Sequence, residues 1–136
     1  HDIFDYARLK NARLIIVLSR RTPKKARIIF QKLDEDKKHI IWDDERGNPY
    51  PDILSIADEI VVTSDSVNMV TEACILGRPV FVAHWGNEQG RLAKFHEIMN
   101  DGGFTRPLSQ AGDAFKPKIL NQMPQIAKKI TAILSA

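Results

Sequence analysis

Two short polar segments of the sequence combine residue types that bind phosphate. The first, Ser19, Arg20, Arg21 and Thr22, follows an apolar run and directly precedes a helical pattern. The first N–H groups of a helix and the positive end of its dipole favour an anion. Arginine adds a planar fork that matches phosphate oxygens. This segment predicts a diphosphate-binding turn; the alternative is an exposed arginine pair beside a threonine that caps the helix.

The second segment, Ser64, Asp65 and Ser66, also precedes a predicted helix, and we expect it to contact the same diphosphate. On a helical projection, Asp65, Asn68 and Glu72 lie within about 60° of one another. A carboxylate on this polar stripe can accept two hydrogen bonds from a ribose. The alternative is a solvated helix face with Asp65 as the cap. The apolar face on the opposite side consists of Val67, Val70 and Cys74.

A histidine after another apolar run, His84, is the side-chain type that titrates nearest neutrality and is a candidate general base. The alternative is a histidine at a strand end that is simply hydrogen-bonded. The four histidines are scattered along the sequence, and we find no Ser-His-Asp set and no metal-ligand spacing. The sequence therefore identifies no catalytic residue and predicts no metal.

The elements that must position these segments alternate between strands and helices. Strands are predicted over residues 13–19, 39–42, 59–63 and 79–83. Helices are predicted from the Thr22 cap with Pro23 as first residue, over 51–57, from about Ser66 to 76, over 88–100, and from about 124. Residues 105–117 look irregular, and residues 1–10 fit either a helix or a linker. This order predicts an α/β, Rossmann-like three-layer domain whose ligands bind beyond the carboxyl ends of parallel strands.

Length and composition limit the classes of protein. With 136 residues, one domain over 1–136 is expected, and because the chain starts at His1 we expect an N-terminal domain to be missing. The lone Cys74 in an apolar pattern predicts a small core residue and a reducing, cytoplasmic location. No stretch has the length of a membrane span, and no signal peptide opens the chain. The oligomeric state is left open.

The charge is unevenly spread, with eleven lysines and arginines but three acids between Arg8 and Lys38. Such a segment suggests an anionic partner: phosphate, nucleic acid or a lipid headgroup. Nucleic acid is disfavoured, because the chain lacks a clear aromatic stacking platform or recognition-helix motif. A peripheral contact with the bacterial inner membrane remains an alternative.

The stretch from Ala57 to Ala83, ADEIVVTSDSVNMVTEACILGRPVFVA, resembles the donor-binding segment of GT-B glycosyltransferases. This resemblance implies the C-terminal half of a GT-B-like fold, with a nucleotide sugar as substrate and no separate cofactor. In it Glu72 matches the glutamate that holds the ribose. The loop after the fourth strand, with Gln89 and Arg91, would contact the donor sugar. The glycine-rich loop after the first strand is replaced here by the double-arginine turn.

Two blocks, SRRTP at residues 19–23 and TSDSVNMVTEA at residues 63–73, resemble the mitochondrial fission "elongated mitochondria" family. Its bacterial members are often labelled nucleoside-diphosphate-sugar epimerases, but this sequence has no glycine fingerprint of that enzyme class. One hypothesis is therefore a nucleotide-sugar-binding half of a glycosyltransferase, inactive when isolated. It would take its acceptor site and catalytic base from the absent N-terminal domain. The other is a non-catalytic module that binds a protein or an anionic membrane surface.

Overall fold

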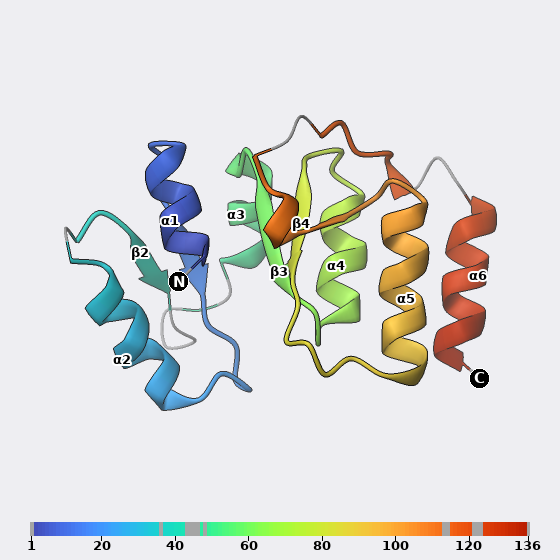
Figure 1. The fold of residues 1–136 in the computed structure, drawn as a ribbon, viewed down its shortest axis with the longest axis horizontal. Helices are drawn as coiled ribbons and strands as arrows, with labels where there is room; N and C mark the ends of the chain where they lie inside the picture. Colours follow the sequence, from blue (N-terminus) through green and yellow to red (C-terminus); the bar gives the residue numbers. More distant parts are fainter. Residues whose placement is uncertain are drawn as a thin grey trace. The chain divides into compact units, whose positions relative to one another are not determined.

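The computed structural model describes residues 2–35, 37–42, 47, 49–112, 115–120 and 124–135. Helices alternate with parallel strands along the chain, which is the Rossmann-like α/β fold that the sequence predicts (Figure 1). The chain divides into two compact units, His1–Ile56 and Ala57–Ala136. Each unit contains its own parallel sheet and is described by itself.

The first unit runs α1 (Asp2–Leu9), β1 (Ile15–Val17), α2 (Lys24–Leu33), β2 (Ile40–Trp42) and α3 (Tyr50–Ile56). Strands β1 and β2 pair in parallel, with Ile15 opposite Ile40. The N-terminal residues, for which the sequence left two readings open, form a helix. Its Phe4 is buried and its ring stacks on Phe30 of α2, with ring centroids 6.2 Å apart.

The predicted cap of α2 is wrong. The helix begins at Lys24, Pro23 occupies the cap position, and no side chain caps it. The hydroxyl of Thr22 instead accepts the N–H of Ser19 over 2.9 Å. This local hydrogen bond competes with capping, as hydrogen bonds between hydroxyl side chains and the nearby backbone often do.

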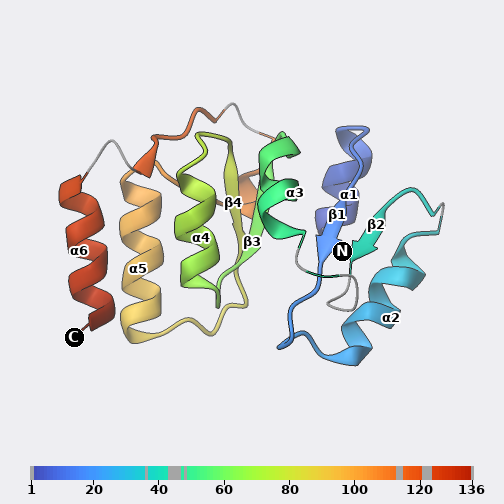
Figure 2. The same ribbon diagram turned by 180° about the vertical axis from the view of Figure 1, so that it is seen from behind.

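The second unit runs β3 (Ile60–Thr63), α4 (Val67–Cys74), β4 (Val80–Ala83), α5 (Gly90–Asp101), β5 (Arg106–Pro107), the 3₁₀ turn η2 (Leu108–Gln110) and α6 (Pro124–Ser135). The three strands are parallel in the order β3-β4-β5, so each connection is a βαβ crossover. Helices α4, α5 and α6 run side by side, as the front and rear views agree (Figures 1 and 2).

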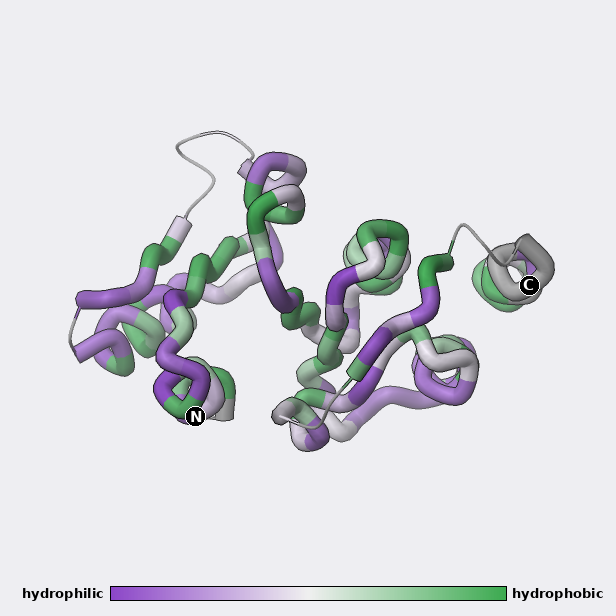
Figure 3. Tube along the Cα trace, turned by 90° about the horizontal axis from the view of Figure 1, so that it is seen from above, coloured by the Kyte–Doolittle hydropathy of each residue, from purple (hydrophilic) through white to green (hydrophobic). Residues whose placement is uncertain are grey.

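The core of the second unit lies between this sheet and its helices. Phe81, Phe95, Met99 and Phe104 are at most 2% exposed. Cys74 is buried beside them, which confirms its prediction as a core residue. In the view from above, α6 carries hydrophobic residues on the side that faces the rest of this unit (Figure 3).

Two predicted boundaries of the second unit are corrected, and one strand was not predicted. Helix α4 ends at Cys74 rather than at residue 76, ahead of Gly77 with its φ of 72°. Helix α5 begins at Gly90 rather than Glu88. The segment expected to be irregular contains β5, which sequence patterns miss because a two-residue strand containing proline has neither alternation nor a full set of donors.

Candidate functional site

The loops that follow β3 and β4 meet at one edge of the sheet. Thr63 and Ala83, the last residues of the two strands, are register partners. The N–H of Ser64 then donates to the carbonyl of Ala83 over 3.0 Å. The predicted turn at residues 64–66 therefore lies against the loop that begins at His84, at the carboxyl ends of two parallel strands (Figure 1). This is where α/β sheets bind their ligands.

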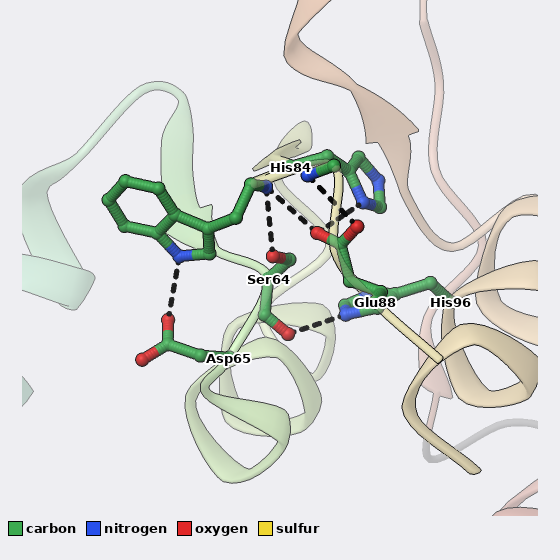
Figure 4. A network of polar contacts seen from close by, with 7 residues as sticks. Ser64, Asp65, His84, Glu88 and His96 are labelled. Carbon is green, nitrogen blue, oxygen red and sulfur yellow. Dashed lines mark hydrogen bonds and ion pairs between the residues drawn. The ribbon is translucent and has the colours of Figure 1, made fainter. Parts of the chain in front are cut away.

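Glu88 organises the loop after β4 (Figure 4). Its carboxylate accepts the N–H of Trp85 over 2.8 Å and that of Gly86 over 3.1 Å, and it lies 3.3 Å from Nδ1 of His84. The hydrogen bond with the Ser64 side chain, followed by backbone N–H groups and the nearby His84, lowers the pKa of Glu88 to about 2. The carboxylate is therefore ionised at neutral pH, and its charge strengthens these hydrogen bonds to the loop.

His96 on α5 forms a hydrogen bond with the turn that follows β3. Its Nε2 lies 2.6 Å from the carbonyl oxygen of Ser64, and because a carbonyl only accepts, we assign the proton to Nε2. The ring is 6% exposed and packs edge-on against His84 with centroids 5.0 Å apart. Burial lowers the pKa of His96. Its Nδ1 is the one buried side-chain nitrogen or oxygen without a hydrogen-bond partner among the described residues.

His84 and His96, which are scattered in the sequence, share one cluster with Glu88 in the fold. Sequence reasoning missed the role of Glu88 because helical spacing placed it inside α5. The missed signal is an acid two to four residues after His84, Trp85 and Gly86, close enough for its carboxylate to fold back onto all three. No local signal connects His96 to Ser64, 32 residues earlier.

Trp85 projects from this loop into solvent with 66% of its surface exposed. Its indole Nε1 donates to the carboxylate of Asp65 over 3.4 Å, and its backbone N–H also lies 3.3 Å from the hydroxyl of Ser64 (Figure 4). Asp65 is therefore not the cap of α4, as one reading had it. The cap position belongs to Ser66, which is buried and makes no side-chain capping bond.

The predicted ribose residues lie on the exposed face of α4. Asn68 and Glu72 are exposed while Val70 and Cys74 on the other side are buried, which confirms the polar stripe over these two positions. Both line a groove of about 300 Å³ between α4 and α6. Its other lining residues include Thr71, Ile130, Thr131 and Leu134.

The remaining predicted residues are also exposed. Gln89 occupies the cap position of α5 without a side-chain capping bond, and Arg91 lies in the first turn of that helix. In the first unit, Arg20 and Arg21 are exposed on a turn closed by Ser19, whose hydroxyl accepts the N–H of Arg21 over 3.2 Å. The meeting of this arginine turn with the turn at residues 64–66 stays a prediction.

Within the part of the chain that the structure describes, no group of three or more histidine, cysteine, aspartate or glutamate side chains is placed to hold a metal ion. None of the helices described combines the length and the apolar character that crossing a bilayer requires.

Comparison with known proteins gives the chain a family. The model of the family described as "Mitochondrial fission ELM1" matches residues 2–134. A relative named "Mitochondrial fission protein ELM1" from Arabidopsis thaliana is 33% identical over 125 residues, which cover 89% of this chain and 29% of that protein. An "Uncharacterized protein RP120" from Rickettsia prowazekii (strain Madrid E) is 35% identical over 71 residues, 49% of this chain and 20% of that protein.

No solved structure matches the chain significantly. The chain spans less than a third of the length of either relative. The match to the family model runs over nearly all of its residues, and the resemblance in the two blocks at residues 19–23 and 63–73 lies within it. The chain belongs to the mitochondrial fission ELM1 family.

Proposed function

We propose that this chain is the nucleotide-sugar-binding part of a GT-B-type, glycosyltransferase-like protein. The observation that carries the proposal is the meeting of the loops after β3 and β4 at the start of α4. The first-turn N–H groups of a helix have no acceptor within the helix and attract an anion. The diphosphate of the ligand is assigned to this place, beside Ser64 and Ser66.

The other predicted residues take complementary roles in the proposal. Arg20 and Arg21 neutralise the diphosphate and stabilise its charge as it departs from the sugar. Glu72 and Asn68, exposed along α4, accept and donate hydrogen bonds to the ribose. Gln89 and Arg91 contact the sugar. The acceptor site and the catalytic base are assigned to a further domain, so that this chain alone binds its ligand weakly and transfers nothing.

Calorimetric titration tests this function. UDP-, GDP-, ADP- and CMP-sugars are titrated into the 136-residue chain at up to millimolar concentration. We expect one nucleotide class to bind, and the double variant Arg20→Ala with Arg21→Ala to bind it at least about tenfold more weakly, because charged hydrogen bonds are lost. The matched control, Lys24→Ala with Lys25→Ala, removes the same charge from exposed positions of α2. Absence of heat with every sugar nucleotide would refute the proposal.

A second candidate is a non-catalytic module that binds an anionic membrane surface. Its support is the name of the Arabidopsis relative, a mitochondrial fission protein, together with the surface of α2. Ile28 and Ile29 are 52% and 54% exposed there, on a helix that also carries Lys24, Lys25 and Lys32. Exposed apolar groups beside cations are typical of helices that bind at a lipid interface.

Sedimentation with vesicles distinguishes this candidate. If it holds, the chain sediments with phosphatidylglycerol-containing vesicles and not with pure phosphatidylcholine. Removal of Arg20 and Arg21 abolishes sedimentation, and nucleotides have no effect. Sedimentation with neither kind of vesicle would eliminate the membrane candidate.

A further inference from the structure

Trp85 is an exposed aromatic residue whose backbone N–H and indole N–H both form hydrogen bonds with the surrounding loops. Its backbone N–H donates to Glu88, and its indole N–H donates to Asp65 on the neighbouring loop. Two thirds of its surface nevertheless remain in water. The hydrogen bond to Asp65 orients the edge of the indole, while most of the side chain stays exposed.

This arrangement contributes little to folding. The hydrophobic contribution of a side chain scales with the apolar area removed from water, and Trp85 leaves most of that area exposed. Ordering the ring costs side-chain entropy in addition. An aromatic ring that is ordered before binding is what a recognition site needs, because the ligand then meets a rigid surface at low entropic cost.

We infer that Trp85 is a stacking platform for the sugar ring of a nucleotide sugar, an inference that rests on the proposed function. The face of an indole carries negative charge density and attracts the polarised C–H groups of a pyranose face. Hydroxyl groups at the rim of such a ring need hydrogen-bond partners. Asp65 offers carboxylate oxygens beside the indole, and Gln89 is an exposed amide further along the same loop as Trp85.

The order of groups along the ligand favours the sugar over the base. Glu72, the proposed ribose residue, lies five positions after Val67, or about 7.5 Å along the axis of α4. Trp85 instead bonds to the turn that precedes this helix. With the diphosphate at the helix start, ribose and base extend toward Glu72, and the group on the other side of the diphosphate reaches Trp85.

Fluorescence tests the inference in a Trp42→Phe background, where Trp85 is the single tryptophan of the chain. UDP-glucose, GDP-mannose and ADP-glucose are each compared with the sugar-free nucleotide. We expect one nucleotide sugar to change the emission with saturation and its nucleotide alone to change it little. Trp85→Ala is expected to weaken calorimetric binding of the nucleotide sugar about five- to tenfold and that of the nucleotide less than about twofold.

Trp85→Phe is the control for folding and chemistry, because it keeps an aromatic face and loses only the bond to Asp65; it should retain most of the affinity. Nucleotide-sugar binding that is unchanged in Trp85→Ala overturns the inference and leaves the proposed function standing. Equal weakening of nucleotide and nucleotide sugar also overturns it, since the ring would then serve the base. An emission shift with phosphatidylglycerol vesicles but with no nucleotide sugar overturns both.

Discussion

His96 donates from Nε2 to the carbonyl oxygen of Ser64 over 2.6 Å, which connects the middle of α5 to the turn at the carboxyl end of β3. Because burial lowers the pKa of His96, the folded chain keeps this ring neutral where the unfolded chain begins to bind a proton. Stability must therefore fall as the pH drops below the unfolded value of 6.5. The turn proposed to bind diphosphate depends on this neutral ring.

The first prediction follows from that linkage. Urea unfolding of the wild-type chain at pH 7.5 and pH 5.5 should show a lower free energy of unfolding at the lower pH. His96→Gln, which keeps an N–H donor and cannot titrate, should be less stable at pH 7.5 by about 1 kcal/mol or more. Its pH dependence between these values should be weaker than that of the wild type. An identical pH slope in both proteins would contradict the assignment.

Glu88 should make the stability of the fold depend on pH in a lower range. Its folded pKa of about 2 lies below the ordinary value of 4.5, so its contribution is present above pH 4.5 and is lost as the pH falls toward 2. Glu88→Gln should therefore lower the Tm at pH 6, and the difference from wild type should shrink steadily between pH 4.5 and pH 2.5.

Glu97→Gln is the matched control for Glu88. It removes the same charge from α5, where the exposed carboxylate meets Lys94 over 3.2 Å. Exposed pairs of this kind contribute about 0–1 kcal/mol, so the Tm should hardly change. Equal effects of both substitutions would show that Glu88 acts through net charge and not through its bonds to the loop.

The lone Cys74 should react very slowly with thiol reagents in the folded chain. It is 2% exposed, and burial raises the pKa of its thiol to about 12. Because the thiolate is the reactive form, Ellman's reagent at pH 8 should label the native chain very slowly and label one thiol per chain at once in 8 M urea. Rapid labelling without denaturant would show that α4 opens readily from the sheet.

The sequence predicts features that depend on residues close together in the chain, and it does not predict contacts between distant residues. Apolar runs and helical spacing located β3, β4 and the buried side of α4, because burial imposes those patterns on neighbouring residues. The placement of the loops at residues 64–66 and 84–91 beyond the carboxyl ends of parallel strands also followed from the predicted fold. The bond from His96 to Ser64 could not be found this way, because it depends on how α5 packs.

Glu88 was missed for a different reason. Its sequence neighbours fit a helix that starts at Glu88, but its carboxylate accepts the N–H groups of Trp85 and Gly86 in the preceding loop. Hydrogen bonding of side chain to nearby backbone thus moved the helix start to Gly90. Arg20 and Arg21 are exposed, as the alternative to a diphosphate-binding turn had them, and their ligand remains a prediction.

The last prediction separates the two ends of the proposed ligand. If Glu72 accepts the ribose hydroxyls, Glu72→Ala should weaken the nucleotide and the nucleotide sugar by the same factor, about tenfold or more, because both contain the ribose. Trp85→Ala should weaken the nucleotide sugar alone. Calorimetry on both variants, with Glu97→Ala as the exposed control, measures the two patterns. A loss in Glu72→Ala that is confined to the sugar-bearing ligand would reverse the order of groups along α4 and remove the argument that directs the sugar toward Trp85.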